Sequence, residues 1–231
     1  MKKLTYSVSC VCLMLFMILF SVFTVVNTES FYTKQYIKNN TEKYTGMSLP
    51  DLEKATVMLL DYINDGRDDL NMQAEEFGVM SETFDEREKT HMVDVKNLYR
   101  FAVRSMLYLL TFSSICLAYM RYADKAMFFD GVLKGAKFAL AFAVVLSLGF
   151  ALMFIFDFNA FWTMFHHVVF TNDLWLLDPK VSTMINMFPL NFFLAMCSSI
   201  LIRFAVLYCA FFTVINTLKK QADRKAAIKQ Q

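Results

Sequence analysis

The sequence lacks the motifs of soluble hydrolases and of zinc enzymes. It contains no GxSxG elbow, in which a nucleophilic serine sits on a strand-to-helix turn. It also contains no HExxH or paired CxxC spacing of the kind that binds zinc. Glycine and proline are scarce, with 6 and 3 in 231 residues, and no internal repeat or low-complexity tract is present. We therefore predict neither serine nucleophilic catalysis nor a resident metal or other cofactor.

The five cysteines indicate no disulfide framework. All of them fall in apolar segments, where thiols usually behave as small apolar side chains: Cys10, Cys12, Cys116, Cys197 and Cys209.

Apolar side chains dominate what is present. They make up 57% of the chain, aromatic residues make up 16%, and the mean hydropathy is positive, as in integral membrane proteins. Four segments reach the roughly 20 apolar residues that a helix needs to cross a hydrocarbon core of about 30 Å. They are Leu4–Val26, Leu98–Met120, Ala136–Phe156 and Phe192–Leu218. We predict an all-α membrane protein with four transmembrane helices, of which the first is an uncleaved anchor in residues 1–26, because no small-residue cleavage site follows it.

The distribution of charge predicts the orientation, because short cytoplasmic loops retain Lys and Arg. Basic residues gather in three regions, before the first predicted span, around the connection between the second and third spans, and after the last span: Lys2, Lys3, Arg121, Lys125, Lys134, Lys137, Lys219, Lys220, Arg224, Lys225 and Lys229. By contrast, residues 27–97 hold 15 acidic side chains against 8 basic ones. We expect both termini in the cytoplasm and a small helical extracytoplasmic domain at 27–97. The membrane domain at 98–231 then has three helices, an extracytoplasmic histidine-bearing loop at 158–190 and a basic tail that contacts anionic lipid. Nucleic-acid binding has no support.

Two helix starts are predicted outside the first span. Ser48, Pro50 and Asp51 provide a cap, an early proline and an acid in the first turn, and Asn64–Gly66 would end that helix. Thr83–Glu86 has the form of a capping box, after an irregular acidic stretch at 67–82. No proline or glycine follows before Met120, so we predict one continuous helix from the outer domain into the second span.

The three histidines are the candidate catalytic groups, and the predicted topology puts all of them on one side of the membrane. His91 precedes Leu98 by seven residues and would stand roughly 10 Å above the apolar section of its helix, at the level of lipid headgroups. His166 and His167 are 100° apart if their segment is helical, so only one of them faces a given site.

Asp94 is the candidate partner of His91, because residues three apart share a helix face and a carboxylate raises the basicity of a nearby imidazole. The spacing is also typical of a solvated acidic helix face. A zinc site built from His91, Asp94, His166 and Asp178 has suitable ligand types, but only one pair has a secure helical spacing.

Further residues are candidates for binding a substrate. Trp175 and its aromatic neighbours have the character of interfacial anchors, and we expect an apolar groove to open near Trp175 and Phe165. Arg203 lies several residues inside the last span, where an arginine is costly unless it pairs or faces a cavity. Asp178 completes the predicted set of substrate-binding residues.

Four short motifs together resemble a family of bacterial membrane proteins, the lipoprotein intramolecular transacylases. They occur in order from Ser48 to Phe193: Leu59-Leu60-Asp61-Tyr62-Ile63 with Asp69-Leu70; Arg87-Glu88 with His91-Met92-Val93-Asp94-Val95; Phe165-His166 with Phe170, Trp175 and Asp178-Pro179; and Met187-Phe188-Pro189 with Phe192-Phe193. The family pattern Phe-His-x-aliphatic-x-Phe falls on His166 and not on His167. Leu190 stands where relatives often carry an acid, so no carboxylate role is assigned there.

The resemblance implies an enzyme of the bacterial cytoplasmic membrane that acts on diacylglyceryl-modified lipoproteins. It would move an acyl chain from the sn-2 glycerol ester to the α-amino group of the N-terminal cysteine, giving a lyso-form lipoprotein. A histidine at headgroup depth is a suitable base for this chemistry, so we predict His166 and His91, with Asp94, as catalytic residues. The alternative is a non-enzymatic sensor or assembly factor that binds a partner through its acidic outer domain.

Overall fold

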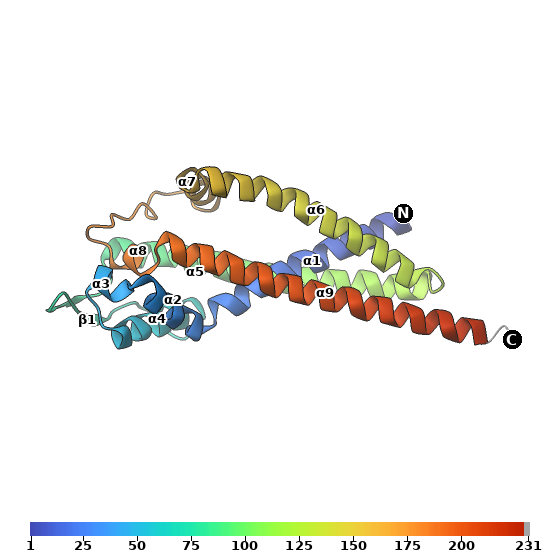
Figure 1. Ribbon diagram of the computed structural model, residues 1–231, viewed down its shortest axis with the longest axis horizontal. Coiled ribbons are helices and arrows are strands. Elements are labelled where there is room, and N and C mark those ends of the chain that lie inside the picture. Colours follow the sequence, from blue (N-terminus) through green and yellow to red (C-terminus); the bar gives the residue numbers. More distant parts are fainter. Residues whose placement is uncertain (229–231) are drawn as a thin grey trace. The chain divides into compact units, whose positions relative to one another are not determined.

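The computed structural model describes residues 1–228, and for residues 146–147 and 149–155 it describes only the helical backbone. Figure 1 follows the elements along the chain. They are α1 (Lys2–Val26), α2 (Glu29–Asn39), α3 (Thr41–Thr45), α4 (Leu49–Ile63), β1 (Gln73–Glu76), β2 (Val79–Glu82), α5 (Glu86–Ala123), α6 (Phe128–Phe156), α7 (Phe158–Val169), α8 (Thr183–Met187) and α9 (Leu190–Ile228). The predicted all-α class is confirmed.

In the part of the chain that the structure describes, three helices have the length and apolar composition needed to cross a membrane. They are α1, α5 and α9, and they contain the first, second and fourth predicted spans. The remaining predicted span, Ala136–Phe156, lies in α6, and its second half falls largely on residues whose side chains lie outside the described part of the structure. α5 is one helix of 38 residues, which confirms the predicted continuity from the outer segment into the second span.

The chain forms two compact units. The first consists of Met1–Ser21, Val103–Phe161 and Leu201–Gln231, and the second of Val22–Ala102 and Trp162–Ile200. The second unit thus contains the predicted outer domain together with most of the predicted histidine-bearing loop. Each unit has its own apolar core.

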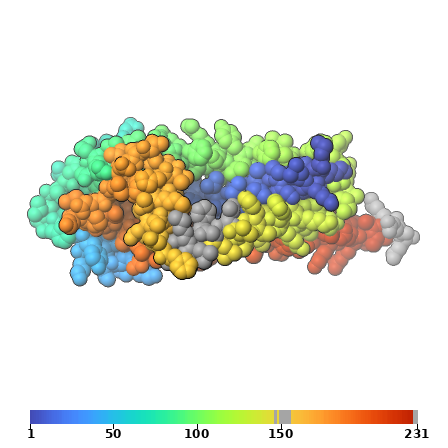
Figure 2. All heavy atoms as spheres, turned by 90° about the horizontal axis from the view of Figure 1, so that it is seen from above, coloured from blue at the N-terminus to red at the C-terminus, as the bar shows by residue number. Residues whose placement is uncertain are grey.

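In the first unit, α1 packs closely against α6, as Figure 2 shows for the N-terminal helix and the neighbouring yellow-green helix. Glycines on α6 permit this approach: a Cβ at Gly131 would lie 2.3 Å from the Tyr6 ring, and one at Gly135 would lie 2.7 Å from the Tyr6 carbonyl oxygen. The Ser113 hydroxyl donates to the Ser9 carbonyl over 2.9 Å and ties α5 to α1. All five cysteines are free thiols.

In the second unit, α4 has the predicted start and end. The Ser48 side chain accepts from the Asp51 N–H, Pro50 lies in the first turn, and Asn64 ends the helix. One face of α4 enters the core, and Thr56 on that face hydrogen-bonds the buried Tyr36 hydroxyl of α2 over 2.7 Å. The segment 29–45, for which the sequence predicted no element, thus forms α2, which packs against α4, and α3, which packs against α2 and α8.

The predicted capping box of α5 has the wrong register. The helix begins at Glu86, and the reciprocal bonds join Asp85 and Glu88: the Asp85 carboxylate accepts from the Glu88 N–H, and Glu88 Oε2 accepts from the Asp85 N–H, both over 2.8 Å. The Thr83 hydroxyl is instead buried without a hydrogen-bond partner. Both Thr83 and Asp85 have an acid three residues later, so sequence alone could not separate the two boxes.

The predicted irregular stretch at 67–82 contains a β-hairpin. β1 and β2 are antiparallel, with Glu76 opposite Val79. The two turn residues, Phe77 and Gly78, have φ of 52° and 85°, as a two-residue hairpin turn requires. Phe77 is an unusual residue for such a turn, which is why the sequence signal was weak.

Candidate active site

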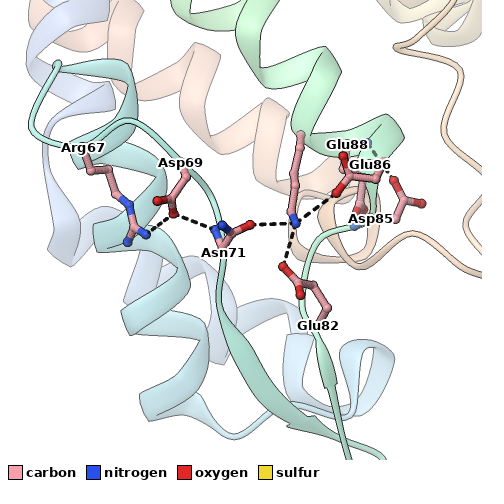
Figure 3. A network of polar contacts seen from close by, with 8 residues as sticks. Arg67, Asp69, Asn71, Glu82, Asp85, Glu86 and Glu88 are labelled. Carbon is pink, nitrogen blue, oxygen red and sulfur yellow. Dashed lines mark hydrogen bonds and ion pairs between the residues drawn. The ribbon is translucent and has the colours of Figure 1, made fainter.

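The N-terminal turn of α5 is held by several polar contacts, and His91 follows one turn later. Figure 3 shows part of this network, in which Lys89 Nζ donates to Glu82 at 2.6 Å and to Asn71 at 2.9 Å. The contacts connect the end of β2, at Glu82, and the loop before β1, at Asn71, to α5. His91 is therefore carried by a firmly anchored part of α5.

Glu88 extends this anchoring to the segment before α9. The residue is 1% exposed, and its Oε1 accepts from the Ser182 hydroxyl at 2.5 Å and from the Met184 N–H at 2.8 Å. Burial raises the pKa of Glu88 above its usual value, although the three hydrogen bonds oppose the shift. Ser182 also caps α8, so one carboxylate fixes α5 against the turn that precedes α9.

His166 lies on α7 in a cage of aromatic rings. It is 5% exposed, its ring centroid is 4.3 Å from that of Trp162, and Trp175 stacks on it at 4.5 Å with an interplanar angle of 27°. His167 is exposed, which confirms that the two rings face different ways. The histidine that matches the family-like motif, His166, is thus also the buried one of the two.

The hydrogen bond of His166 defines its tautomer. Nδ1 lies 2.7 Å from the Trp162 carbonyl oxygen, which can only accept, so Nδ1 carries the proton. The neutral ring therefore has its lone pair on Nε2. This is the form that a general base requires.

His91 lies beside His166. The centroids of the two histidine rings are 6.5 Å apart. The His91 ring also packs edge to face against the Phe170 ring, with 5.3 Å between their centroids. His91 is 8% exposed, and its Nδ1 has no hydrogen-bond partner in the structure. A proton donor or acceptor at this nitrogen would have to come from a bound molecule or from solvent.

The pKa of each histidine is lowered, which favours the neutral form of both rings. Burial, and then the positive charge that His166 would carry, lower the pKa of His91 to about 4, while Asp94 opposes the shift. Burial also lowers the pKa of His166, opposed by the hydrogen bond to Trp162. Both histidines lie outside the predicted spans. His91 precedes Leu98, where the apolar section of α5 begins, and His166 lies on α7, a separate helix that follows α6.

The two histidines line an apolar cavity of about 310 Å³ that lies wholly within the second unit. Most other lining side chains are aliphatic or aromatic, and they come from α4, α5, α8 and α9, among them Leu59, Ile63, Met92, Met184, Phe192 and Met196. Phe165 and Trp175 also line it, so an apolar cavity lies at the residues where the sequence predicted an apolar groove. The arrangement places two neutral bases against a space suited to a hydrocarbon chain.

The structure brings together four of the seven residues predicted for the site: His91, His166, Phe165 and Trp175. Asp94 does not line this cavity but an adjoining one. Asp178 is exposed, and its side chain accepts from the Lys180 N–H over 2.9 Å. Arg203 lies on α9 in the first unit.

Three residues that contribute to the site were not predicted. Trp162 precedes His166 by four residues, a spacing that places both on one helix face and could have been recognised. Glu88 entered the sequence analysis only as part of the family-like motif around His91, since no pattern indicates its burial. Asn172, which donates to Asp94 over 2.8 Å, lies in a loop for which periodicity carries no information.

Within residues 1–228, apart from the side chains at 146–147 and 149–155, no three His, Cys, Asp or Glu side chains are grouped so that they could hold a metal ion.

The helices that can cross a membrane define a membrane protein, and two histidines with lowered pKa values line an apolar cavity in it. The family model described as lipoprotein intramolecular transacylase Lit matches residues 7–193, and the chain belongs to this family. It is therefore a membrane enzyme that acts on lipoproteins by transacylation. Family membership favours this function over the sensor or assembly factor considered above.

Solved structures have the same fold. The lipoprotein intramolecular transacylase Lit from Bacillus cereus is 18% identical, with 96% of this chain and 98% of that chain covered and a TM-score of 0.74. A variant of that protein in which one histidine is replaced by arginine is 19% identical, with coverages of 96% and 95% and a TM-score of 0.75. No curated protein matches the chain. At these identities the likeness concerns the fold.

Proposed function

We propose that the chain transfers the acyl group from the sn-2 glycerol ester of a diacylglyceryl lipoprotein to the α-amino group of its N-terminal cysteine. The product is a lyso-form lipoprotein. The observation that carries the proposal is His166, whose hydrogen bond to the Trp162 carbonyl leaves Nε2 as a free base at the wall of an apolar cavity.

The reaction needs a base because an amine must lose a proton as it attacks an ester. The neutral amine nitrogen attacks the ester carbonyl carbon, and His166 Nε2 takes one N–H proton. The tetrahedral intermediate then breaks its bond to the glycerol oxygen, which receives the proton. One N–C bond forms, one C–O bond breaks, and the products are an amide and an alcohol.

His91 is the proposed partner of His166 in the second half of the reaction. Its Nδ1 has no hydrogen-bond partner among the described residues, and its ring centroid is 6.5 Å from that of His166. His91 can therefore pass the proton to the departing oxygen or stabilise the oxyanion. The negative charge of Asp94 acts against burial and raises the pKa of His91, which favours a transient positive charge. Asp94 thus assists the pair electrostatically.

The remaining residues bind the substrate in this proposal. Phe165 and Trp175 line the cavity that would hold the acyl chain. Arg203 and Asp178, which do not line it, are proposed contacts to other parts of the lipoprotein or the membrane lipid. The site faces the extracytoplasmic side of the bacterial cytoplasmic membrane, with both termini in the cytoplasm, and the substrate enters sideways from the outer leaflet.

The proposal is tested on lipoprotein N-termini from cells with and without the gene. Because the transfer is intramolecular, the total mass does not change, so tandem mass spectrometry must locate each acyl chain. N-acylated, lyso-form cysteine should depend on the gene and on His166. Lyso-form cysteine that persists without the gene, or an acyl chain taken from another lipid, would contradict the proposal.

A further inference from the structure

A second cavity, of about 450 Å³, adjoins the histidine cavity. Leu98 and Phe170 line both, so these two side chains form the boundary between them. The second cavity is more polar and is also lined by Asp94, Asn97, Phe101, Val168, Val169, Thr171 and Asn172. It lies wholly within the second unit.

Asp94 is held in a defined position at this second cavity. Asn172 Nδ2 donates to Asp94 Oδ2 over 2.8 Å, and Asn172 Oδ1 accepts from the Leu174 N–H over 3.0 Å. The second bond fixes which end of the amide faces the carboxylate. Asp94 therefore presents its charge from a constrained geometry, although the loop that holds it has no regular structure.

The other oxygen of Asp94 remains available. Within the described residues, Asp94 forms no ion pair with Lys or Arg, and only Oδ2 has a hydrogen-bond partner. The nearby Arg87 guanidinium donates instead to the Asp173 carbonyl oxygen. A half-buried carboxylate without a cationic partner is expected to bind a positively charged group of a ligand.

We propose that Asp94 binds the α-ammonium group of the N-terminal cysteine of the lipoprotein substrate. This inference rests on the proposed function, in which the ester lies in the histidine cavity. The α-amino group has an ordinary pKa of about 7.7–8.0 and is largely charged at neutral pH. Two neutral histidines on an apolar cavity offer it no counter-charge, whereas Asp94 does so just across Leu98 and Phe170.

The ion pair has an effect on the chemistry as well as on binding. A carboxylate stabilises the ammonium form and raises the pKa of the amine, so the amine must release one proton to solvent before it attacks, which leaves His166 free to take the second proton. The charged and titratable groups around it are Asp94, Arg87, His91 and His166. Replacing Asp94 by Asn should therefore weaken binding of the substrate while it shifts the rising limb of kcat to lower pH.

The test uses the full-length His166→Gln variant in phosphatidylcholine nanodiscs as a parent whose turnover is slow enough for binding to be measured. Two synthetic diacylglyceryl lipopeptides are compared, identical except that the cysteine amine is free in one and acetylated in the other. The parent should bind the free amine roughly tenfold more tightly, as a charge-assisted hydrogen bond allows. Asp94→Asn in the parent should remove that preference and leave the affinity for the acetylated peptide unchanged.

Asp173→Asn is the matched control, since it removes a negative charge from the same loop but not from the cavity lining, and it should keep the preference. Equal binding of both peptides by the parent, or equal weakening of both by Asp94→Asn, would overturn the assignment. Loss of the preference for the free amine when phosphatidylethanolamine is added would also overturn the assignment, because Asp94 would then bind the ammonium group of a lipid headgroup. A parent that binds neither peptide would overturn the proposed function along with it.

Discussion

Replacing His166 by Gln tests the catalytic proposal most directly. The ring lies 4.3 Å from Trp162 and 4.5 Å from Trp175 between centroids, so truncation to Ala would leave a void, and large-to-small changes in a core cost about 2–5 kcal/mol. Gln has a similar volume, and its amide can still donate to the Trp162 carbonyl, but it has no basic nitrogen. The variant should fold and lose the proton acceptor alone.

The expected loss of rate follows from the role of a general base. Such help is typically worth about 10²–10⁴-fold, or about 3–5 kcal/mol at 1.36 kcal/mol per tenfold. His167→Gln is the matched control: its ring is exposed and meets Trp175 only at an edge, 5.3 Å between centroids, so most activity should remain.

The assay follows loss of the primary amine of a synthetic diacylglyceryl lipopeptide with an amine-reactive dye, because the transfer leaves the mass unchanged. Thermal unfolding of each variant is measured in parallel. A His166→Gln enzyme within threefold of wild type, or a dead His167→Gln enzyme beside an active His166→Gln enzyme, would refute the assignment of the base.

Four further predictions follow. His91→Ala should lower kcat by about 10²–10⁴-fold in the same assay, and retention of activity would remove His91 from the mechanism. Burial lowers the pKa of His91 to about 4 and also lowers the pKa of His166, so the loss of kcat/KM that comes from protonating either ring should set in below the ordinary histidine value of about 6.5. A histidine inflection at or above pH 6.5 in the pH profile of kcat/KM would contradict this. Chelators should leave the purified enzyme active, because a neutral imidazole suffices as base, and restoration by zinc of chelator-abolished activity would favour a metal mechanism. A cysteine at Gln73 should react with an impermeant maleimide in intact cells and one at Lys125 should not; the reverse labelling would contradict the outward-facing site.

Local sequence patterns predicted the parts of the fold that depend on near neighbours. The cap at Ser48 and the end at Asn64 were predicted because each uses residues within one turn of the helix end. The continuity of α5 followed from the lack of a helix breaker between Glu86 and Met120. The same local reasoning could not choose between Thr83 and Asp85 as cap, since the choice depends on which residue the surrounding core buries.

The sequence by itself determined the membrane class, the all-α composition and the different facing of His166 and His167, because hydropathy and a helical period of 3.6 residues are properties of the chain. Only the tertiary structure decided that His91 and His166, 75 positions apart, share one cavity. It also decided that Asp94 turns to Asn172 and an adjoining cavity, and that Glu88 is buried against Ser182. These pairings join α5 to segments more than 70 residues away in the chain, and their partners are selected by packing and burial, which no local periodicity encodes.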